Sequence, residues 1–380
     1  MRTRRDGPVA GATISSGEIV TTTDTWGRFV LRNVPPKYDL MSTQDGRAQI
    51  FHGLTTRRPT IQNHRNDGWF NTTPVHIDYS DATTIGSERI TFAVRDDLGT
   101  EEIFYGAMGP NTLDSTIFWA GPTSELTGTF LSLEYERPNR YGPPHYLGIA
   151  TAPMRLLPDQ KANFHPIYSP IAKTTTITGV ARAAPGTTIY NSYLRLSFGG
   201  LYSILDRTHS IYTQPEQFIV PEIAGASWAI EYEAYTTGAP DSSGGARSAM
   251  IVPVGADGSV PEVDLPAPPR IISPAEGTTD FGVGSEIVWQ GEGACTVSMG
   301  DTDYKHSVSF TTLESHLTMP DLSAAGMPLE HGRQYRIFVW CHRRSNRAPS
   351  DDPVLDFTDY YLGSPAGTSG YARNFVVTAR

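Results

Sequence analysis

Lysine, cysteine and long apolar runs are all scarce in this sequence, and each scarcity excludes something. Only four of the 30 Lys and Arg residues are lysine, which indicates the codon usage of a GC-rich genome rather than a function. The two cysteines, Cys295 and Cys341, are too few for an all-cysteine zinc site and form no CxxC redox motif. No apolar run approaches the roughly 20 residues that a membrane-spanning helix needs, so we expect no membrane span.

The charge balance and the first residues restrict the partners and the compartment. The chain carries 40 acidic against 30 basic residues, a net charge of −10, and we therefore expect no nucleic-acid partner. The opening segment 1–6 is charged, but no apolar stretch follows it as in a secretory leader. Either the protein is cytosolic or a leader preceded this chain, and the later features favour a leader.

Common catalytic and metal-binding signatures are also missing. The sequence has no GxSxG, HExxH or GxxxxGK[ST] motif and no glycine-rich dinucleotide turn. His52, His64 and His76 lie nearest to one another among the ten histidines, but each falls in a different predicted element. The acidic pairs Asp301/Asp303 and Asp351/Asp352 lack the ligand spacing of a calcium loop. We expect no catalytic residue, no metal site and no cofactor.

Short alternating runs rich in Thr, Val, Ile, Tyr and Phe fill most of the chain, with Gly, Pro, Asp and Asn between them about every ten residues. This spacing predicts an all-β protein made of tandem antiparallel β-sandwiches. The best strand candidates are Arg89–Arg95, Thr127–Glu136, Thr174–Arg182, Ala226–Thr237 and Tyr335–His342. The best helix candidates are Pro153–Ala162 and Asp321–Gly326.

Proline-rich seams divide the chain into predicted units at 1–74, 75–170, 171–265 and 266–380. The clearest linker is the sequence DLPAPP at 264–269, because consecutive prolines favour an extended spacer. The two central units contain the similar segments LEYER (133–137) and IEYEA (230–234), and they either stand apart or form one larger sandwich.

The first unit contains GPVAGATI at 7–14, TTTDTWGRFVL at 21–31, Val34-Pro35 and YDL at 38–40. It resembles the carboxypeptidase regulatory-like domain, a transthyretin-like sandwich grouped with carbohydrate-binding-like folds. We expect Asp24 to close an Asx-turn, Gly27 to adopt a positive φ, and Phe29 and Leu31 to point into a core. The family has an earlier strand, so either that strand lies outside this chain or another part of the protein completes the edge. The resemblance implies a domain that is generally not catalytic.

The last unit opens with PRIISPAEG at 269–277, continues with GSEIVW at 284–289 and contains LEHGRQY at 329–335. It resembles a fibronectin type III-like sandwich, with Trp289 as the buried tryptophan. Leu329, Gly332 and Tyr335 match the family's tyrosine corner, which implies that the Tyr335 hydroxyl is tied back to the neighbouring turn.

Strand alternation places Cys341 on one face with Tyr335, Ile337 and Val339, and Cys295 on one face with Val297 and Met299. Both faces are inward on strands that the fibronectin-like fold makes neighbours. A Cys295–Cys341 disulfide would indicate an oxidising compartment. The alternative is two buried free thiols.

Two pairs of glutamates lie at alternate strand positions, Glu134/Glu136 and Glu231/Glu233, so each pair leaves one strand face. Paired carboxylates serve in glycoside hydrolysis. A solvated sheet face, opposite the apolar residues that alternate with them, is the simpler interpretation and the one we expect.

Aromatic residues outside predicted strands are the leading ligand-binding candidates: Trp26, Trp69, Phe70, Tyr360, Tyr361 and Tyr371. Flat rings on sandwich loops stack against sugar faces, and the alternative is that they fill seams between domains. Trp119, Trp289 and Trp340 are expected to serve in packing.

Together these features resemble large exported proteins and lipoproteins of GC-rich bacteria. The leading hypothesis is a secreted or cell-surface protein without catalytic activity that binds a glycan or polysaccharide. The second is a scaffold of sandwich modules that spaces or presents other surface proteins, and the third is a glycoside hydrolase.

Overall fold

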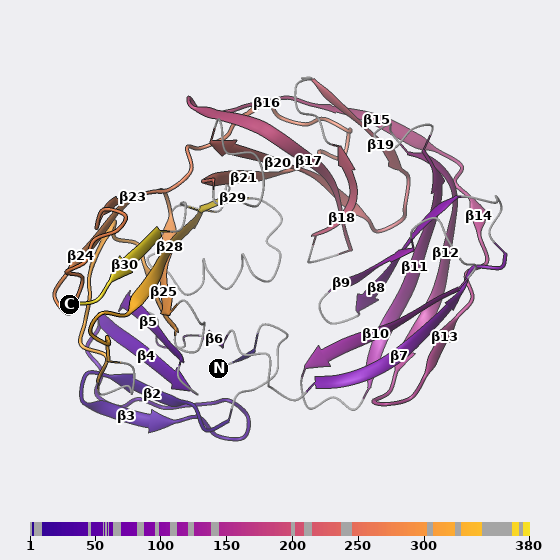
Figure 1. Cartoon of the computed structure of the whole chain (residues 1–380). Coiled ribbons are helices and arrows are strands. Elements are labelled where there is room, and N and C mark those ends of the chain that lie inside the picture. Colours follow the sequence, from indigo (N-terminus) through magenta and orange to yellow (C-terminus); the bar gives the residue numbers. More distant parts are fainter. Residues whose placement is uncertain are drawn as a thin grey trace.

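A computed structural model describes residues 2–3, 10–44, 47–55, 57, 59, 61–63, 70–81, 87–95, 99–106, 112–120, 125–137, 144–198, 202–208, 215–236, 245–301, 307–323, 328–343, 367–371 and 375–380. For some strand residues among these, only the backbone is described. The regular structure is strand, arranged around an open ring (Figure 1). The predicted all-β class is therefore confirmed. Within these ranges, no helix has the length and apolar character needed to cross a bilayer.

The largest sheet has thirteen strands and runs through both ends of the chain. Its order is β18 (Tyr202–Thr208), β17 (Thr187–Ser197), β20 (Ser227–Thr236), β21 (Arg247–Pro253), β29 (Gly367–Tyr371), β28 (Gln334–Arg343), β25 (Ala294–Asp301), β26 (Ser307–Thr312), β5 (Arg47–Leu54), β4 (Tyr38–Gln44), β2 (Thr13–Ser16) and β3 (Ile19–Thr22), with β30 (Phe375–Thr378) also paired to β28. The parallel β5–β26 pair joins the N-terminal strands to the C-terminal ones. An edge of the N-terminal sheet is thus completed by a distant part of the chain.

Smaller sheets pack around this one. One central sheet has five strands in the order β14 (Ser169–Pro170), β12 (His145–Leu156), β11 (Leu126–Glu136), β8 (Glu88–Arg95) and β9 (Gly99–Gly106). A second central sheet has three strands in the order β10 (Thr112–Ala120), β7 (Phe70–Asp78) and β13 (Ala162–Phe164). The C-terminal sandwich is closed by β23 (Arg270–Ser273), β24 (Glu286–Gln290) and β27 (His316–Thr318). Two-stranded sheets are β15 (Thr174–Gly179) with β19 (Glu216–Pro221), β16 (Ala181–Arg182) with β22 (Val263–Asp264), and β1 (Arg2–Thr3) with β6 (Gln62–Asn63).

Four hydrophobic clusters hold these sheets together. One cluster contains residues from both predicted central units, for example Phe92 and Leu133 with Tyr232 and Leu194. The five-stranded central sheet therefore shares a core with strands β17, β20 and β21 of the largest sheet. The predicted domain boundaries themselves stay predictions.

The prediction of a helix at 153–162 is wrong. Strand β12 continues through Pro153, and the buried Met154 and Leu156 alternate with the exposed Arg155. That period of two belongs to a strand with one face in the core. A turn with Asp159 at a φ of 57° leads into β13, and only part of the second helix candidate, 321–323, lies in the described ranges.

The C-terminal sandwich confirms the predicted pairing of the cysteines. Strands β25 and β28 are antiparallel neighbours with Cys295 opposite Cys341, and the two sulfurs form a disulfide. Trp289 lies in the same core and is 2% exposed. The disulfide thus ties the two strands together inside an apolar cluster.

Candidate functional site: the Trp26 turn and the buried carboxylates

A closed turn after β3 presents the side chain of Trp26 to solvent. The Asp24 Oδ1 atom accepts hydrogen bonds from the backbone N–H groups of Trp26 and Arg28, each at 2.8 Å. The backbone N–H of Gly27 donates to the Asp24 carbonyl at 2.9 Å, and Gly27 has a φ of +67°. The predicted Asx-turn and positive φ are therefore confirmed. These hydrogen bonds keep the turn closed, and the turn carries the Trp26 indole side chain, which is 59% exposed.

The segment that follows the turn is anchored on one side and open on the other. Phe29 and Leu31 pack against the N-terminal core, as predicted. Arg28, Val30 and Arg32 alternate with them and are exposed, with Val30 at 68%. Alternate residues of an extended segment point to opposite sides, so these three side chains leave the surface in the same general direction. Sequence reasoning singled out Trp26 alone, although the alternation around Phe29 and Leu31 was the signal for its neighbours.

The other aromatic candidates do not join Trp26 in one site within the described ranges. Trp69, Tyr360 and Tyr361 lie outside those ranges. Only the backbone is described for Phe70, which begins β7, and for Tyr371, which ends β29 opposite Arg247 and Trp340. These two positions and the Trp26 turn belong to three different places in the sheet system.

The glutamates expected on solvated sheet faces are mostly buried, so that expectation is wrong. Glu134, Glu231 and Glu233 are 0%, 4% and 5% exposed, and Glu136 is half-buried. The reason lies in neighbouring strands: β20 runs between β17 and β21, and both supply cationic or polar partners.

Glu231 is held by two arginines from the flanking strands. Arg195 on β17 donates from Nε to Glu231 Oε2 at 2.7 Å and also from Nη2 to the same oxygen. Arg247 on β21 places Nη2 3.6 Å from Glu231 Oε1. Both carboxylate oxygens therefore face a guanidinium group.

Glu233 shares Arg247 and adds neutral donors. Arg247 Nη2 donates to Glu233 Oε1, while Asn191 Nδ2, Tyr193 OH and Tyr235 OH lie 2.9, 3.1 and 3.3 Å from Glu233 Oε2. Burying a carboxylate is tolerated when its oxygens are paired and hydrogen-bonded in this way. The contacts of Glu231 and Glu233 are those of a structural ion network.

Glu134 belongs to a second buried polar network, in the β8–β11 sheet. Its Oε1 accepts a hydrogen bond from Ser87 at 2.5 Å, and Ser87 in turn accepts one from Arg89 at 3.3 Å. Ser132, two positions earlier on β11, contacts the Tyr168 hydroxyl at 2.8 Å. Burial raises the pKa of the Tyr168 hydroxyl above its ordinary value.

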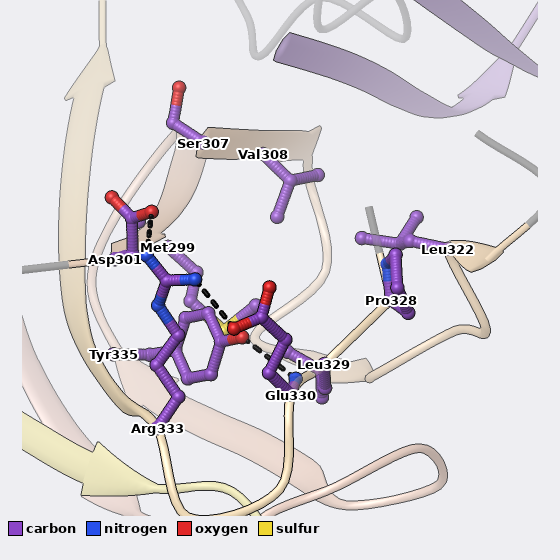
Figure 2. Close-up of a pocket in the computed structure, with 11 residues that line it drawn as sticks. Met299, Asp301, Ser307, Val308, Leu322, Pro328, Leu329, Glu330, Arg333 and Tyr335 are labelled. Carbon is purple, nitrogen blue, oxygen red and sulfur yellow. Dashed lines mark hydrogen bonds and ion pairs between the residues drawn. The ribbon is translucent and has the colours of Figure 1, made fainter. Parts of the chain in front are cut away.

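A small pocket that opens to solvent lies beside the tyrosine corner of the C-terminal sandwich (Figure 2). The Tyr335 hydroxyl accepts a hydrogen bond from the backbone N–H of Glu330 at 2.9 Å, which confirms the predicted corner. Arg333 bridges the Asp301 carboxylate, which is 1% exposed, and the Glu330 carboxylate at 2.8 and 2.6 Å. The charged groups along this wall therefore bind one another (Figure 2).

His52, His76 and His165 contact aspartates within the described ranges. His52 lies 3.0 Å from Asp39, and His76 lies 2.8 Å from Asp114. His165 lies 2.9 Å from Asp81 and 3.3 Å from Asp78, and the hydrogen bond with Asp81 is the main cause that raises the pKa of His165. Across the described part of the chain, no group of three or more His, Cys, Asp or Glu side chains is arranged to hold a metal ion.

Comparisons with known proteins add little to this geometry. No protein-family model matches the sequence, and no curated protein matches it. Among solved structures, the FN1–FN3 domains of chicken CNTN1 match over 97% of this chain and 100% of that chain, with 9% identity and a TM-score of 0.18. That likeness is too low to carry an argument about function. The resemblance of the first unit to the carboxypeptidase regulatory-like domain stays a prediction.

Proposed function

We propose that this chain is a non-catalytic, secreted or cell-surface binding protein that recognises carbohydrate through the Trp26 turn. The single observation behind the proposal is a large aromatic ring, 59% exposed, on a turn that its own hydrogen bonds hold closed. A ring presented on a rigid backbone loses little conformational freedom when it stacks on a ligand. Flat sugar faces suit such a ring, because stacking needs apolar area without a deep pocket.

Two further observations support the non-catalytic, extracellular part of the proposal. Glu231 and Glu233, one of the two glutamate pairs of the sequence, are occupied by Arg195, Arg247 and neutral donors. A general acid must instead reach the substrate with an exchangeable proton. The Cys295–Cys341 disulfide fits an oxidising compartment.

The test is retention of the intact chain on a panel of immobilised polysaccharides, in calcium and in chelator. We expect retention of the wild type and its loss in Trp26→Ala, with unchanged thermal unfolding. Ile167→Ala is the matched control, because Ile167 is also a large, exposed apolar residue (71% exposed) but lies just before β14, on a different sheet from the Trp26 turn. Equal retention of Trp26→Ala and the wild type would contradict the proposal.

A scaffold of sandwich modules is the second candidate function. The observation that favours it is the continuous sheet, in which β5 and β26 join the two ends of the chain. A scaffold predicts no polysaccharide retention by the folded wild type. It also predicts stable association with another surface protein.

A further inference from the structure

We propose that the Trp26 turn is specific for acidic polysaccharides, whose carboxylate or sulfate groups pair with Arg28 and Arg32. This inference rests on the proposed function and names its ligand class. Its starting point is the open row formed by Trp26, Arg28, Val30 and Arg32, all of which are exposed. The row combines two fixed positive charges on one side of an anchored segment with an exposed aromatic ring on the turn directly before that segment.

The spacing of the row suits a chain-like ligand. In an extended segment each residue advances roughly 3.3 Å, so Arg28 and Arg32 are separated by roughly 13 Å along the backbone. Asn33, with a φ of 63°, turns the chain immediately after Arg32 and ends the row. A linear polymer that stacks on Trp26 can therefore run past both guanidinium groups, whereas a single sugar cannot reach all three.

The two arginines have no carboxylate partner among the described residues. This sets them apart from Arg155, Arg182 and Arg195, each of which contacts a glutamate. The nearby carboxylate of Asp24 directs its Oδ1 to two backbone N–H groups of the turn. Guanidinium groups that lack an internal counter-ion are available for planar, bidentate pairing with carboxylate or sulfate.

The charge composition of the N-terminal sequence points the same way. Residues 1–60 contain nine Lys and Arg against five Asp and Glu, although the whole chain carries 30 against 40. Lys37 is exposed, and the exposed Arg57 donates to the Val34 carbonyl at 3.3 Å, beside the row. A basic region on an acidic protein attracts polyanions locally, while the rest of the molecule repels them. That combination favours an acidic polymer bound at this end of the chain.

The test compares polymers that differ in charge. Dextran, dextran sulfate and polygalacturonate serve as probes, so that backbone, sulfate and carboxylate are separated. We expect the wild type to bind both acidic polymers more tightly than dextran and to lose that preference in high salt. Arg28→Gln/Arg32→Gln should bind the acidic polymers roughly tenfold more weakly, as two surface charge pairs are removed.

The matched control is Arg270→Gln/Arg380→Gln, which removes the same charge from two exposed arginines of the C-terminal sandwich. This variant should bind like the wild type. Trp26→Ala should weaken binding to every polymer that the wild type binds, charged or neutral. This pattern separates the contribution of stacking from that of charge.

Each contrary outcome has a distinct meaning. Equal affinity for dextran and dextran sulfate, or equal losses in the two arginine variants, would overturn the inference and leave carbohydrate binding standing. Retention on none of these three polymers would overturn the inference, and retention on no polysaccharide of the wider panel would overturn the proposed function as well. If the wild type instead self-associates at low salt and Arg28→Gln/Arg32→Gln does not, the row binds the acidic part of a second copy, and the inference is wrong.

Discussion

Arginines meet different surroundings in two regions of this molecule. On β17 and β21, Arg195 and Arg247 contact the buried carboxylates of Glu231 and Glu233. On the segment after Trp26, Arg28 and Arg32 are exposed and contact no carboxylate among the described residues. In the first region the arginines neutralise carboxylates that are buried in the protein. In the second region the arginines are available to pair with an anionic partner.

The difference follows from where each segment lies in its sheet. Strand β20 has neighbours on both sides, so its side chains are enclosed by β17 and β21 on either edge. The Trp26 turn follows β3, the last strand at its end of the thirteen-stranded sheet. An element at a sheet end has fewer neighbours to supply counter-charges.

The largest effect is expected when the buried network is broken. Glu233→Ala removes one carboxylate partner of Arg247 and the acceptor of the hydrogen bonds that Asn191 and Tyr193 donate to Glu233. Removing one member of a buried charge pair costs about 3–5 kcal/mol. We expect the midpoint of urea unfolding to fall accordingly.

Glu222→Gln is the control for that measurement. Glu222 pairs with Lys173 at 3.2 Å, but both side chains are about two-thirds exposed. A surface pair contributes roughly 0–1 kcal/mol. Similar shifts for the two variants would contradict the contrast between interior and surface charge.

Reduction of the disulfide is the next largest perturbation. Cys295 and Cys341 are separated by 46 residues, and a crosslink closing a loop of this size contributes about 2–4 kcal/mol. We expect the reduced protein to unfold at a lower temperature. Trp26-dependent polysaccharide retention should persist, because the Trp26 turn has its own hydrogen bonds and core.

Intact mass before and after reductant establishes the bond before that measurement is made. The native protein should contain no alkylatable thiol. Two alkylated cysteines in the untreated, folded protein would show that the bond is not formed.

A smaller effect is expected at the tyrosine corner. Tyr335→Phe removes the hydroxyl that accepts the Glu330 backbone hydrogen bond and keeps the buried ring. The loss of one such bond costs about 1 kcal/mol. Chemical denaturation should show this decrease, and an unchanged midpoint would indicate that water replaces the hydroxyl without cost.

The features that sequence reasoning predicted correctly are mostly local. Asp24, Gly27, Phe29 and Leu31 lie within eight residues of one another, and turn chemistry with strand alternation predicts all their roles. The tyrosine corner likewise links Tyr335 to a residue five positions earlier. The disulfide needed only alternation and the adjacency of two strands.

Features that depend on distant strands were missed. Whether Glu231 meets solvent depends on Arg195, which lies 36 residues earlier on another strand. The parallel pairing of β5 with β26 joins segments more than 250 residues apart, and no pattern within either segment indicates it. The outward row at Arg28 and Arg32 was visible as alternation, but its lack of counter-charges required the tertiary structure.

The smallest change in stability, and the sharpest test of the exposed region, is expected from Asp24→Ala. This variant removes the acceptor of the Trp26 and Arg28 backbone N–H groups but keeps both side chains. Because the turn is exposed and water can replace the lost bonds, unfolding should shift by no more than about 1 kcal/mol. Polysaccharide retention should nevertheless fall, since binding then has to order the turn as well as the ligand. Asp24→Asn keeps an oxygen acceptor and should retain most of the binding. If Asp24→Ala binds as tightly as the wild type, the closed turn does not contribute to presenting Trp26, and the exposed ring alone accounts for recognition.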